Sequence, residues 1–536
     1  MIDGAEHGWV NAHGARDLRP YGPWHGSAIV GLMETSDPRA VGPTTVAETH
    51  ISTVLLTGDR AYKLLKPVAT GFLDHRSSES RLAAIDDELR LNRRLAPDVY
   101  LGTADVVEQG RVVDRFLVMQ RLPHDRRLSL RVGHPGFDDD LRAVTRAVAA
   151  FHSSLEPLQG EAASMATVEA VRAHWESSFA DIGHHVGSVI DGGEFDRVQS
   201  MARAYLATSA ALFERRIADG WVRDGHGDLT AEDIFCLDDG PRIIDCLAFD
   251  AELRVSDVLA DIAFLAMDVH RLAGAEAARR MMSWYGEFTN EHHAPSLAHF
   301  YVAYRAHVRA KVECIRYGQG VTQAASAARL YHALAAHHLE RARVRLVLVG
   351  GGPGVGKSTV ARGIADQTGW SLLDSDELRK DLAGVDHLHH VDAGPGEGIY
   401  TSEMTDAVYR TLVDRAEALL RQGRSVVIDA SWNRAVHRDR AREMADTHGV
   451  DVIELHCLLD PAIARERVAR RLATGADPSD ATPEVVDHLL AEHDDWRQAS
   501  EVDTSAPADE VLERAVARAC RPTVTTAAGA STTTSY

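Results

Sequence analysis

Hydrophobic and polar positions follow two different patterns along this chain. In the first part, short apolar runs at 50–68 and 112–120 predict strands, 80–95 has helical spacing, and helical patterns dominate 140–220 and 255–336. In the C-terminal third, apolar runs and helical patterns follow one another regularly. Such alternation indicates βαβ units around a parallel sheet.

The change of pattern divides the chain. We expect an α+β domain over 44–340 and an α/β domain with a parallel sheet over 341–520. Residues 1–43, rich in Gly, His and Pro, form a lead segment, and the Thr-, Ala- and Ser-rich residues 521–536 are predicted to be disordered. A chain of 536 residues is too long for one ordinary core, which agrees with this division.

Charge and cysteine usage narrow the class of protein. A net charge of −21 disfavours nucleic acid and anionic membranes as partners. No apolar stretch reaches the length of a membrane span, and the N-terminus lacks a signal-peptide pattern. The five cysteines are scattered without a CxxC pair, so neither a disulfide framework nor a cysteine zinc site is expected. We therefore predict a cytoplasmic protein, with its oligomeric state left open.

A phosphate-binding loop is the most specific motif. The loop comprises eight consecutive residues that satisfy GxxxxGK[ST], followed by Thr359: Gly351, Gly352, Pro353, Gly354, Val355, Gly356, Lys357 and Ser358. A strand pattern precedes it and a helical pattern follows. Its backbone N–H groups would surround the phosphates of ATP, Lys357 would reach the β- and γ-phosphates, and Ser358 would ligate Mg²⁺.

Acidic residues follow the neighbouring strands. Asp429 ends an apolar strand and would complete the Mg²⁺ site. Asp376 is the candidate base for an acceptor hydroxyl; alternatively, Ser375 or Asp376 caps the next helix. Arg379, one turn further on, could hold an acceptor or a phosphate.

A helix that begins at Asp460-Pro461 carries four arginines. They are Arg465, Arg467, Arg470 and Arg471, of which Arg467 and Arg471 are our candidates for a lid over the nucleotide. The alternative is a solvated basic face. With the loop and the acidic pair, these arginines make residues 341–515 resemble the small P-loop kinases of the gluconate kinase and zeta-toxin type. The resemblance implies phosphoryl transfer to a small hydroxylated acceptor.

Three aspartates in the first domain have the spacing of a second site. Asp228 lies in the sequence HGD, Asp233 follows five positions later, and Asp245 follows a tight hairpin. Protein kinases place a catalytic Asp and two metal ligands in this way, with the hairpin returning the last ligand beside the first. Asp228 would deprotonate the acceptor hydroxyl, while Asp233 and Asp245 would hold Mg²⁺.

The segments HGDLTAEDI and IIDC resemble the aminoglycoside phosphotransferase-like family over residues 44–335. Two residues depart from that family's pattern: Thr230 stands in place of His, and Asp233 in place of a metal-binding Asn. The resemblance implies a protein-kinase-like α+β fold. Asp233 could still ligate Mg²⁺, but its extra charge could slow phosphoryl transfer.

A kinase-like fold also needs a lysine on a strand paired with a helical glutamate. Lys63 is the first candidate and Lys66 the second; Glu88 is the first candidate partner and Glu79 the second. Residues 116–122 would hold adenine through backbone groups, and the hydroxyl groups of residues 49–52 could cover the phosphates.

The sequence allows more than one role for two further groups of residues. Asp257 and Asp261, at helical spacing, could bind a polar acceptor, but facing solvent or capping a helix is the expected reading. His387, His389 and His390 form the only tight histidine cluster in the sequence, and a loop beside the acceptor is favoured over a metal site.

The patterns together predict an ATP-dependent phosphotransferase with two Mg·ATP sites and a small hydroxyl-bearing substrate. One alternative is an ATP-responsive regulatory or stress protein whose kinase-like half binds without turnover. Another, a kinase acting on polynucleotide 5′ ends, is disfavoured by the acidic balance.

Overall fold

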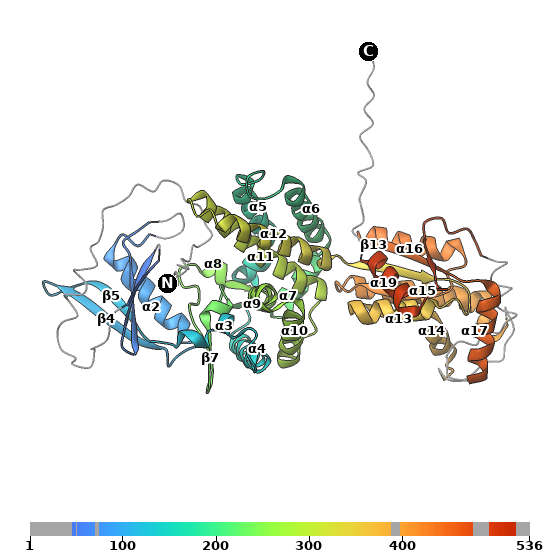
Figure 1. The fold of residues 1–536 in the computed structure, drawn as a ribbon, viewed down its shortest axis with the longest axis horizontal. Coiled ribbons are helices and arrows are strands. Elements are labelled where there is room, and N and C mark those ends of the chain that lie inside the picture. The colour runs from blue at the N-terminus through green and yellow to red at the C-terminus, as the bar shows by residue number, and fades with distance from the viewer. Residues whose placement is uncertain (1–44, 50, 70–73, 387–396, 475–492, 521–536) are drawn as a thin grey trace, which may run out of the picture. The chain divides into compact units, whose positions relative to one another are not determined.

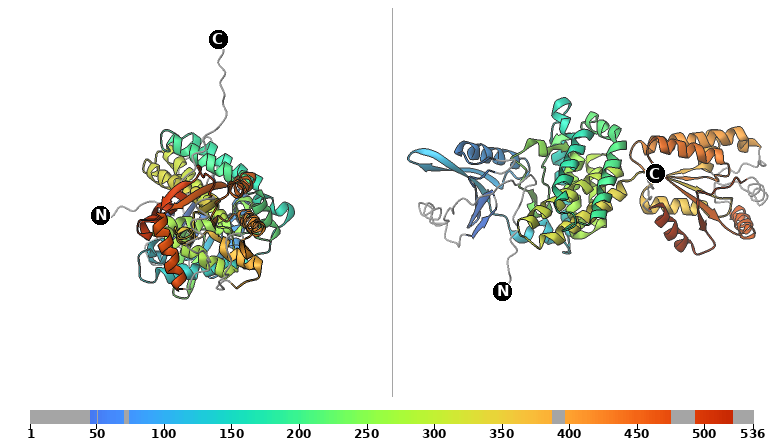
Figure 2. Two further views of the ribbon diagram at one scale, coloured as in Figure 1. Left: turned by 90° about the vertical axis from the view of Figure 1, so that its right-hand side faces the viewer. Right: turned by 90° about the horizontal axis from the view of Figure 1, so that it is seen from above.

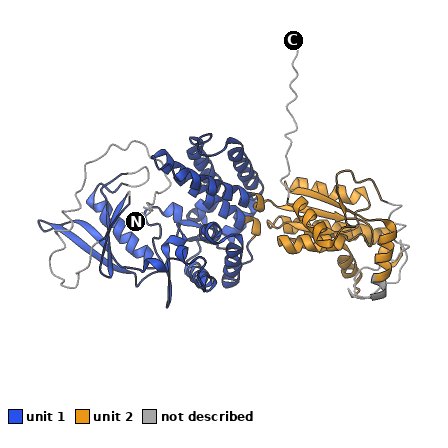
Figure 3. Ribbon diagram, in the orientation of Figure 1, with its two compact units in different colours: residues 1–293, 298–339 blue, residues 294–297, 340–536 orange. Residues whose placement is uncertain are grey.

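The computed structural model describes residues 45–49, 51–69, 74–386, 397–474 and 493–520. Backbone contacts divide the chain into two compact units, with residues 1–293 and 298–339 in unit 1 and residues 294–297 and 340–536 in unit 2 (Figure 3). The expected order, an α+β domain followed by an α/β domain with a parallel sheet, is confirmed (Figure 1). No described helix is long and apolar enough to cross a bilayer.

Unit 1 begins with an antiparallel sheet in the order β1-β2-β3-β5-β4. Its elements are β1 (Thr45–Glu48), β2 (Ser52–Thr57), β3 (Arg60–Leu65), β4 (Tyr100–Glu108) and β5 (Arg111–Gln120). Gly58, with φ 56°, opens the predicted turn between β2 and β3. Helix α2 (Ser78–Asn92) packs on the sheet, burying Ile85 and Leu91. The sheet and this helix position the first candidate site.

The rest of unit 1 is mainly helical. Its longer helices are α4 (Phe137–Ser154), α5 (Val168–Gly183), α6 (Gly192–Thr208), α7 (Ala210–Ala218), α9 (Val258–Ala273), α10 (Ala275–Thr289), α11 (Pro295–Gly318) and α12 (Ala324–Ala342). Short elements lie between them: η1 (His124–Arg126), α3 (Leu128–Arg131), η2 (Gly160–Ala166), β6 (Val222–Asp224), η3 (Ala231–Asp233), β7 (Ile234–Leu237), β8 (Gly240–Ile243), α8 (Ala251–Arg254) and β9 (Val255–Asp257). The pairs β6–β9 and β7–β8 are antiparallel.

Unit 2 has a parallel sheet in the order β11-β12-β10-β13-β14. Its strands are β10 (Arg345–Gly350), β11 (Ser371–Asp374), β12 (Val426–Asp429), β13 (Asp451–Leu458) and β14 (Ser500–Asp503). Its helices are α13 (Lys357–Thr368), α14 (Ser375–Ala383), η4 (Gly398–Tyr400), α15 (Ser402–Leu420), α16 (Ala435–Thr447), α17 (Pro461–Thr474) and α19 (Ala508–Ala519). Each predicted strand and helix of this domain is present.

Helices cover both faces of this sheet (Figure 2). Because successive side chains of a strand point to opposite faces, Leu346 and Leu348 of β10 pack with α15 and α16, whereas Val347 and Val349 pack with α13 and α19. Burial on both sides explains the continuous apolar run that the sequence displays. The carboxyl ends of the strands carry the second candidate site.

Candidate functional site

Lys63 lies at the centre of the first site. Its Nζ is 2.7 Å from Glu88 Oε1 on α2 and 3.5 Å from Asp245 Oδ1 after the hairpin β7–β8. Burial works against the ammonium, but the two carboxylates hold the pKa of Lys63 above its ordinary value. The first-choice pair from the sequence therefore meets in the structure. Lys66 instead contacts Glu48.

The hairpin places Asp233 and Asp245 as expected. Asp233 immediately precedes β7, and the backbone N–H of Ile244, just after β8, donates to its carbonyl at 3.0 Å. Asp245 adopts φ 63°, a left-handed conformation that Asp tolerates better than most residues, and its N–H donates to the Tyr100 hydroxyl. The turn directs the Asp245 carboxylate toward Lys63.

The carboxylates of Asp228, Asp233 and Asp245 lie close enough to repel one another. Burial raises the pKa of Asp228 to about 6, and Asp245 adds to the rise while Arg309 opposes it. Burial, Asp245 and Asp228 raise the pKa of Asp233 well above its ordinary value. The Thr230 hydroxyl donates to Asp233 Oδ2 at 2.8 Å. A divalent cation bound by hard oxygen ligands would relieve this repulsion, so the residues fit Mg²⁺.

Asp261 holds the loop that carries Asp228. Its Oδ2 and Oδ1 accept from the backbone N–H groups of His226 and Gly227 at 2.7 and 2.9 Å. The ring of His152 lies 3.1 Å from Oδ2. A Cβ on Gly225 would come within 2.5 Å of the same carboxylate, so this approach requires glycine. Despite full burial, these donors hold the pKa of Asp261 below its usual range.

This arrangement corrects one expectation. Asp257 and Asp261 are 2% and 0% exposed, so neither faces solvent. Asp257 does cap α9 through the N–H of Leu259, and it also pairs with the buried Arg216 at 2.6 Å. Asp261 is a structural anchor of the loop, because both of its oxygens are occupied by protein donors. The helical spacing of Asp257 and Asp261 could not indicate that Asp261 contacts His226, which lies 35 residues earlier in the chain.

The residues proposed to cover phosphates make a local turn. The hydroxyl groups of Thr49 and Ser52 lie 2.8 Å apart, and Thr49 Oγ1 also accepts from the Ser52 backbone N–H. These groups fix the entry to β2. The proposed adenine-binding stretch occupies the end of β5 and the residues after it.

The phosphate-binding loop connects β10 to α13. Gly351, Gly354 and Gly356 have φ of 141°, 77° and 92°. A Cβ on Gly351 would meet Cys457 O at 2.6 Å, and one on Gly354 would meet Ala464 O at 2.5 Å. Glycine is therefore required by both backbone conformation and space. The loop ends at the N-terminus of α13, where N–H groups and the helix dipole favour an anion.

Carboxylates face this loop from the ends of β11 and β12, where Asp374 and Asp429 are register partners. Asp429 is 2% exposed, accepts from the Ser358 hydroxyl, and its charge interacts with Lys357. Burial raises the pKa of Asp429 above its ordinary value. Its Oδ1 has no hydrogen-bond partner among the described residues. An unpartnered buried carboxylate oxygen beside Ser358 fits a Mg²⁺ ligand, directly or through water.

The helix cap here differs from the one expected. Asp374, rather than Ser375 or Asp376, caps α14, accepting from the N–H groups of Asp376 and Glu377 at 2.8 and 3.2 Å. Burial, with the charges of Asp429 and Asp376, raises the pKa of Asp374 to about 6. Asp376 stands half-buried in the first turn of α14 and is not the capping residue.

The other candidate residues of unit 2 have different surroundings in the structure. Arg379 donates to Ile399 O and to Thr405 Oγ1, so it orders the segment before α15. Arg467 lies beside the loop: its Nη2 donates to Thr504 O, and its Nη1 is 3.7 Å from where a Gly356 Cβ would be. Arg471 belongs to α17, but its side chain is outside the described residues, and so is the cluster at 387–390.

Known proteins resemble this chain in sequence. Residues 346–495 match the family described as an AAA domain. The chain is 37% identical over 479 residues to the uncharacterized proteins Mb2027c of Mycobacterium bovis and Rv2004c of Mycobacterium tuberculosis, covering 88% of this chain and 94% of each relative. The chain belongs to the family of these mycobacterial proteins. The P-loop domain expected in the C-terminal third is thereby confirmed.

Two solved structures that resemble parts of this chain share little sequence identity with it. A choline/ethanolamine kinase family protein from Mesorhizobium loti is 14% identical, with 57% of this chain and 88% of that chain covered and a TM-score of 0.33. A gluconokinase from Sinorhizobium meliloti is 20% identical, with 32% and 90% covered and a TM-score of 0.24. TM-scores this low leave the function to be argued from the chain's own residues.

The sequence did not reveal a polar group beside the P-loop. The Tyr409 hydroxyl lies 3.0 Å from Ser431 Oγ and accepts from the Trp432 N–H at 3.0 Å. The His437 ring stacks on Tyr409 with centroids 4.0 Å apart. Positive charge on Arg379 and Lys357 acts on the Tyr409 hydroxyl. Ser431, two residues beyond Asp429, was the one available signal, since residues after a parallel strand face the ligand crevice.

Proposed function

We propose that this protein is an ATP-dependent phosphotransferase with two Mg·ATP sites, at least one of which transfers the γ-phosphoryl group to a hydroxyl of a small molecule. The observation that carries the proposal is the contact of Lys63 with both Glu88 and Asp245, beside the half-buried Asp228 and the buried Asp233. A lysine, a helical glutamate and three aspartates in this arrangement are the parts of a kinase site. The P-loop unit supplies the second nucleotide site.

In unit 1, Lys63 would bind the phosphates and Glu88 would keep its ammonium in place. Asp233 and Asp245 would hold Mg²⁺. When bound, Mg·ATP supplies the phosphoryl group and neutralises the charge that develops on it. Asp228 would accept the proton of the acceptor hydroxyl as the oxygen forms its bond to phosphorus and ADP leaves. A carboxylate with a pKa of about 6 is ionised at neutral pH and basic enough for this task.

In unit 2, the N–H groups of the loop, Lys357 and Ser358 would bind the phosphates and Mg²⁺, with Asp429 completing the metal site. Asp376 is the candidate base there, and Arg467 lies beside the loop. Its guanidinium would stabilise charge on the transferred group.

A second candidate function has its own supporting observation. The Thr230 hydroxyl donates to Asp233, and the buried Asp233 adds a third negative charge beside Asp228 and Asp245, where the resembling family has Asn. A site so charged could bind Mg·ATP firmly yet transfer slowly. Unit 1 would then bind nucleotide without turning it over. The protein would use this unit for regulation rather than for catalysis.

The experiment that separates the two uses labelled γ-phosphate and a panel of sugars, nucleosides, amino alcohols and aminoglycosides. The wild type is compared with Asp228→Asn and Asp376→Asn. If the protein is a kinase, at least one acceptor gains label, and one of the variants abolishes the transfer. If no acceptor is labelled while ATP still binds, the regulatory reading replaces the enzymatic one.

A further inference from the structure

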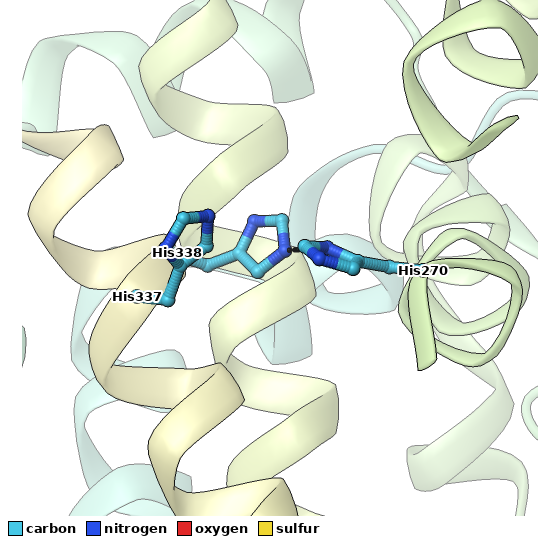
Figure 4. A group of neighbouring side chains, drawn as sticks. All are labelled: His270, His337 and His338. Carbon is cyan, nitrogen blue, oxygen red and sulfur yellow. Dashed lines mark hydrogen bonds between the residues drawn. The ribbon is translucent and has the colours of Figure 1, made fainter. Parts of the chain in front are cut away.

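Four histidines from three helices of unit 1 meet in one place. His270 ends the last full turn of α9, His299 lies near the start of α11, and His337 and His338 are neighbours on α12. One ring nitrogen from each of His270, His337 and His338 lies within 4.8 Å of the others (Figure 4). This is the group with metal-ligand spacing found among the described residues.

The contacts within the group are short and directional. His270 Nδ1 is 2.8 Å from His338 Nε2, and His299 Nδ1 is 2.9 Å from His338 Nδ1. The rings of His270 and His338 are inclined at 72°, and those of His270 and His337 at 87°. Both nitrogens of the buried His338 therefore face other imidazoles.

We propose that His270, His337 and His338 form a binding site for a divalent transition metal, with Zn²⁺ as the reference ion. Imidazole nitrogens bind Zn²⁺ at about 2.0–2.1 Å, so the nitrogens of a tetrahedral site lie roughly 3.3 Å apart. The separations here bracket that value, and small ring rotations would bring the three nitrogens to it. Three histidines leave one tetrahedral position for water or an anion.

His299 acts as a positioning residue for this site. If His338 binds the metal through Nε2, its Nδ1 carries the proton and donates it to His299 Nδ1 at 2.9 Å. A metal-bound histidine commonly donates its second N–H in this way, which fixes the tautomer and the ring orientation. His299 thus holds His338 ready without touching the metal.

The site has a consequence for the first candidate site. Helix α9 carries Asp261, which holds the loop of Asp228, and Asp268, whose Oδ2 accepts from the Ala231 backbone N–H at 3.1 Å. His270 lies two residues beyond Asp268. A metal bound by His270 and His338 would therefore fasten the end of this scaffold helix to α12. No residue of the metal site belongs to the proposed nucleotide sites.

The test is a titration of the metal-free full chain with Zn²⁺ and with Co²⁺, in excess Mg²⁺ and without nucleotide. The wild type should bind one equivalent, with the visible absorption of Co²⁺ in a nitrogen-rich tetrahedral site. His337→Gln and His338→Gln should each weaken binding at least tenfold. Because His337 is exposed and His338 buried, His337→Gln keeps the test valid even if His338→Gln fails to fold.

Further variants separate the roles. His299→Ala should weaken binding about 10–100-fold while the Co²⁺ spectrum keeps its shape, and His299→Asn, which retains an acceptor, should restore part of the affinity. The exposed His184→Gln is the matched control, and the triple replacement of His387, His389 and His390 by Gln should bind like the wild type. Zn²⁺ should raise the melting temperature of the wild type but not of His337→Gln. The proposal is overturned if the folded wild type binds no metal, or if binding is unchanged in both His337→Gln and His338→Gln.

Discussion

Lys63 Nζ contacts Glu88 Oε1 at 2.7 Å and Asp245 Oδ1 at 3.5 Å, so one ammonium group joins helix α2 to the residue that follows the hairpin β7–β8. Glu88 is fixed in turn by its position on a buried turn of α2, where its backbone carbonyl accepts from the Asn92 side chain. Asn92 also accepts from the Cys246 N–H at 2.7 Å. Two connections, one ionic and one through Asn92, thus hold the sheet layer and the hairpin of unit 1 together.

Replacing Lys63 should remove the activity of unit 1. Lys63→Met deletes the group that would bind phosphate and leaves Glu88 and Asp245 facing each other, so we expect a loss in kcat/KM of about 10²-fold or more. The matched control is Lys66→Met, since Lys66 contacts Glu48 and the carbonyl of Thr49 instead. Steady-state kinetics with the acceptor found in the panel measures both. Equal losses in the two variants would contradict the assignment.

The pH dependence of unit 1 should follow Asp228. Its pKa of about 6 predicts that kcat/KM falls as the pH drops below that value, because the protonated carboxyl cannot accept a proton. The charge of Arg309 lowers this pKa, so Arg309→Met should move the acidic limb about one unit or more toward higher pH.

The control for this prediction keeps the charge. Tyr331→Phe removes a hydroxyl bonded to Arg309 but leaves the guanidinium, so its profile should match the wild type. If the acidic limb of the kcat/KM profile does not move in Arg309→Met, a group other than Asp228 limits the rate at low pH.

Asp261 should stabilise unit 1 strongly. Asp261→Asn replaces a buried carboxylate that accepts from two backbone N–H groups and contacts His152, and we expect a loss of roughly 2–4 kcal/mol in the free energy of unfolding. Urea denaturation followed by circular dichroism measures the loss. The exposed Asp219→Asn is the control and should change little.

The depressed pKa of Asp261 also determines how its contribution to stability changes with pH. The folded-state pKa of Asp261 is depressed, so its contribution is complete above the unfolded value of about 3.9 and is lost as the pH falls toward the folded value. The difference between wild type and Asp261→Asn should therefore shrink below about pH 4. A difference that grows on acidification would show that the carboxylate is not held in its ionised form.

The phosphate-binding loop offers a matched pair of glycines. Gly354 and Gly369 have nearly the same φ, 77° and 74°, but an added Cβ meets Ala464 O at 2.5 Å only at Gly354. Both Ala variants carry the cost of a left-handed alanine, about 1–2 kcal/mol. Only Gly354→Ala should also displace α17 and lower the affinity of unit 2 for Mg·ATP, as measured by calorimetry. Equal affinities in the two variants would place the nucleotide elsewhere.

The elements of unit 2 could be predicted from the sequence because its signals are local. The run 346–349 is apolar at every position since β10 is buried on both faces, and the loop after it has a fixed motif. The loop of Asp228 and the hairpin β7–β8 of unit 1 were predictable for the same reason. Lys63 and Glu88 could be paired because AYK at 61–63 matches the kinase lysine pattern and Glu88 lies in the helical stretch that follows.

Other contacts depend on folding and have no local signal. Asp261 and His152 are 109 residues apart, and they meet because α4 and α9 both pack against α10. The sequence drew attention to the histidines at 387–390, whereas His270, His299 and His338 meet through three separate helices. At Asp374, the cap moved one residue earlier than expected because β11 ends there and its carboxylate reaches the first N–H groups of α14.

The central claim is that each unit builds its own Mg·ATP site, and binding stoichiometry tests it most directly. Calorimetry with a non-hydrolysable ATP analogue and Mg²⁺ should give two sites per chain for the wild type, one for Lys357→Ala and one for Lys63→Met. The double variant should bind none. A single site in the wild type, or two sites that survive in either single variant, would contradict the account.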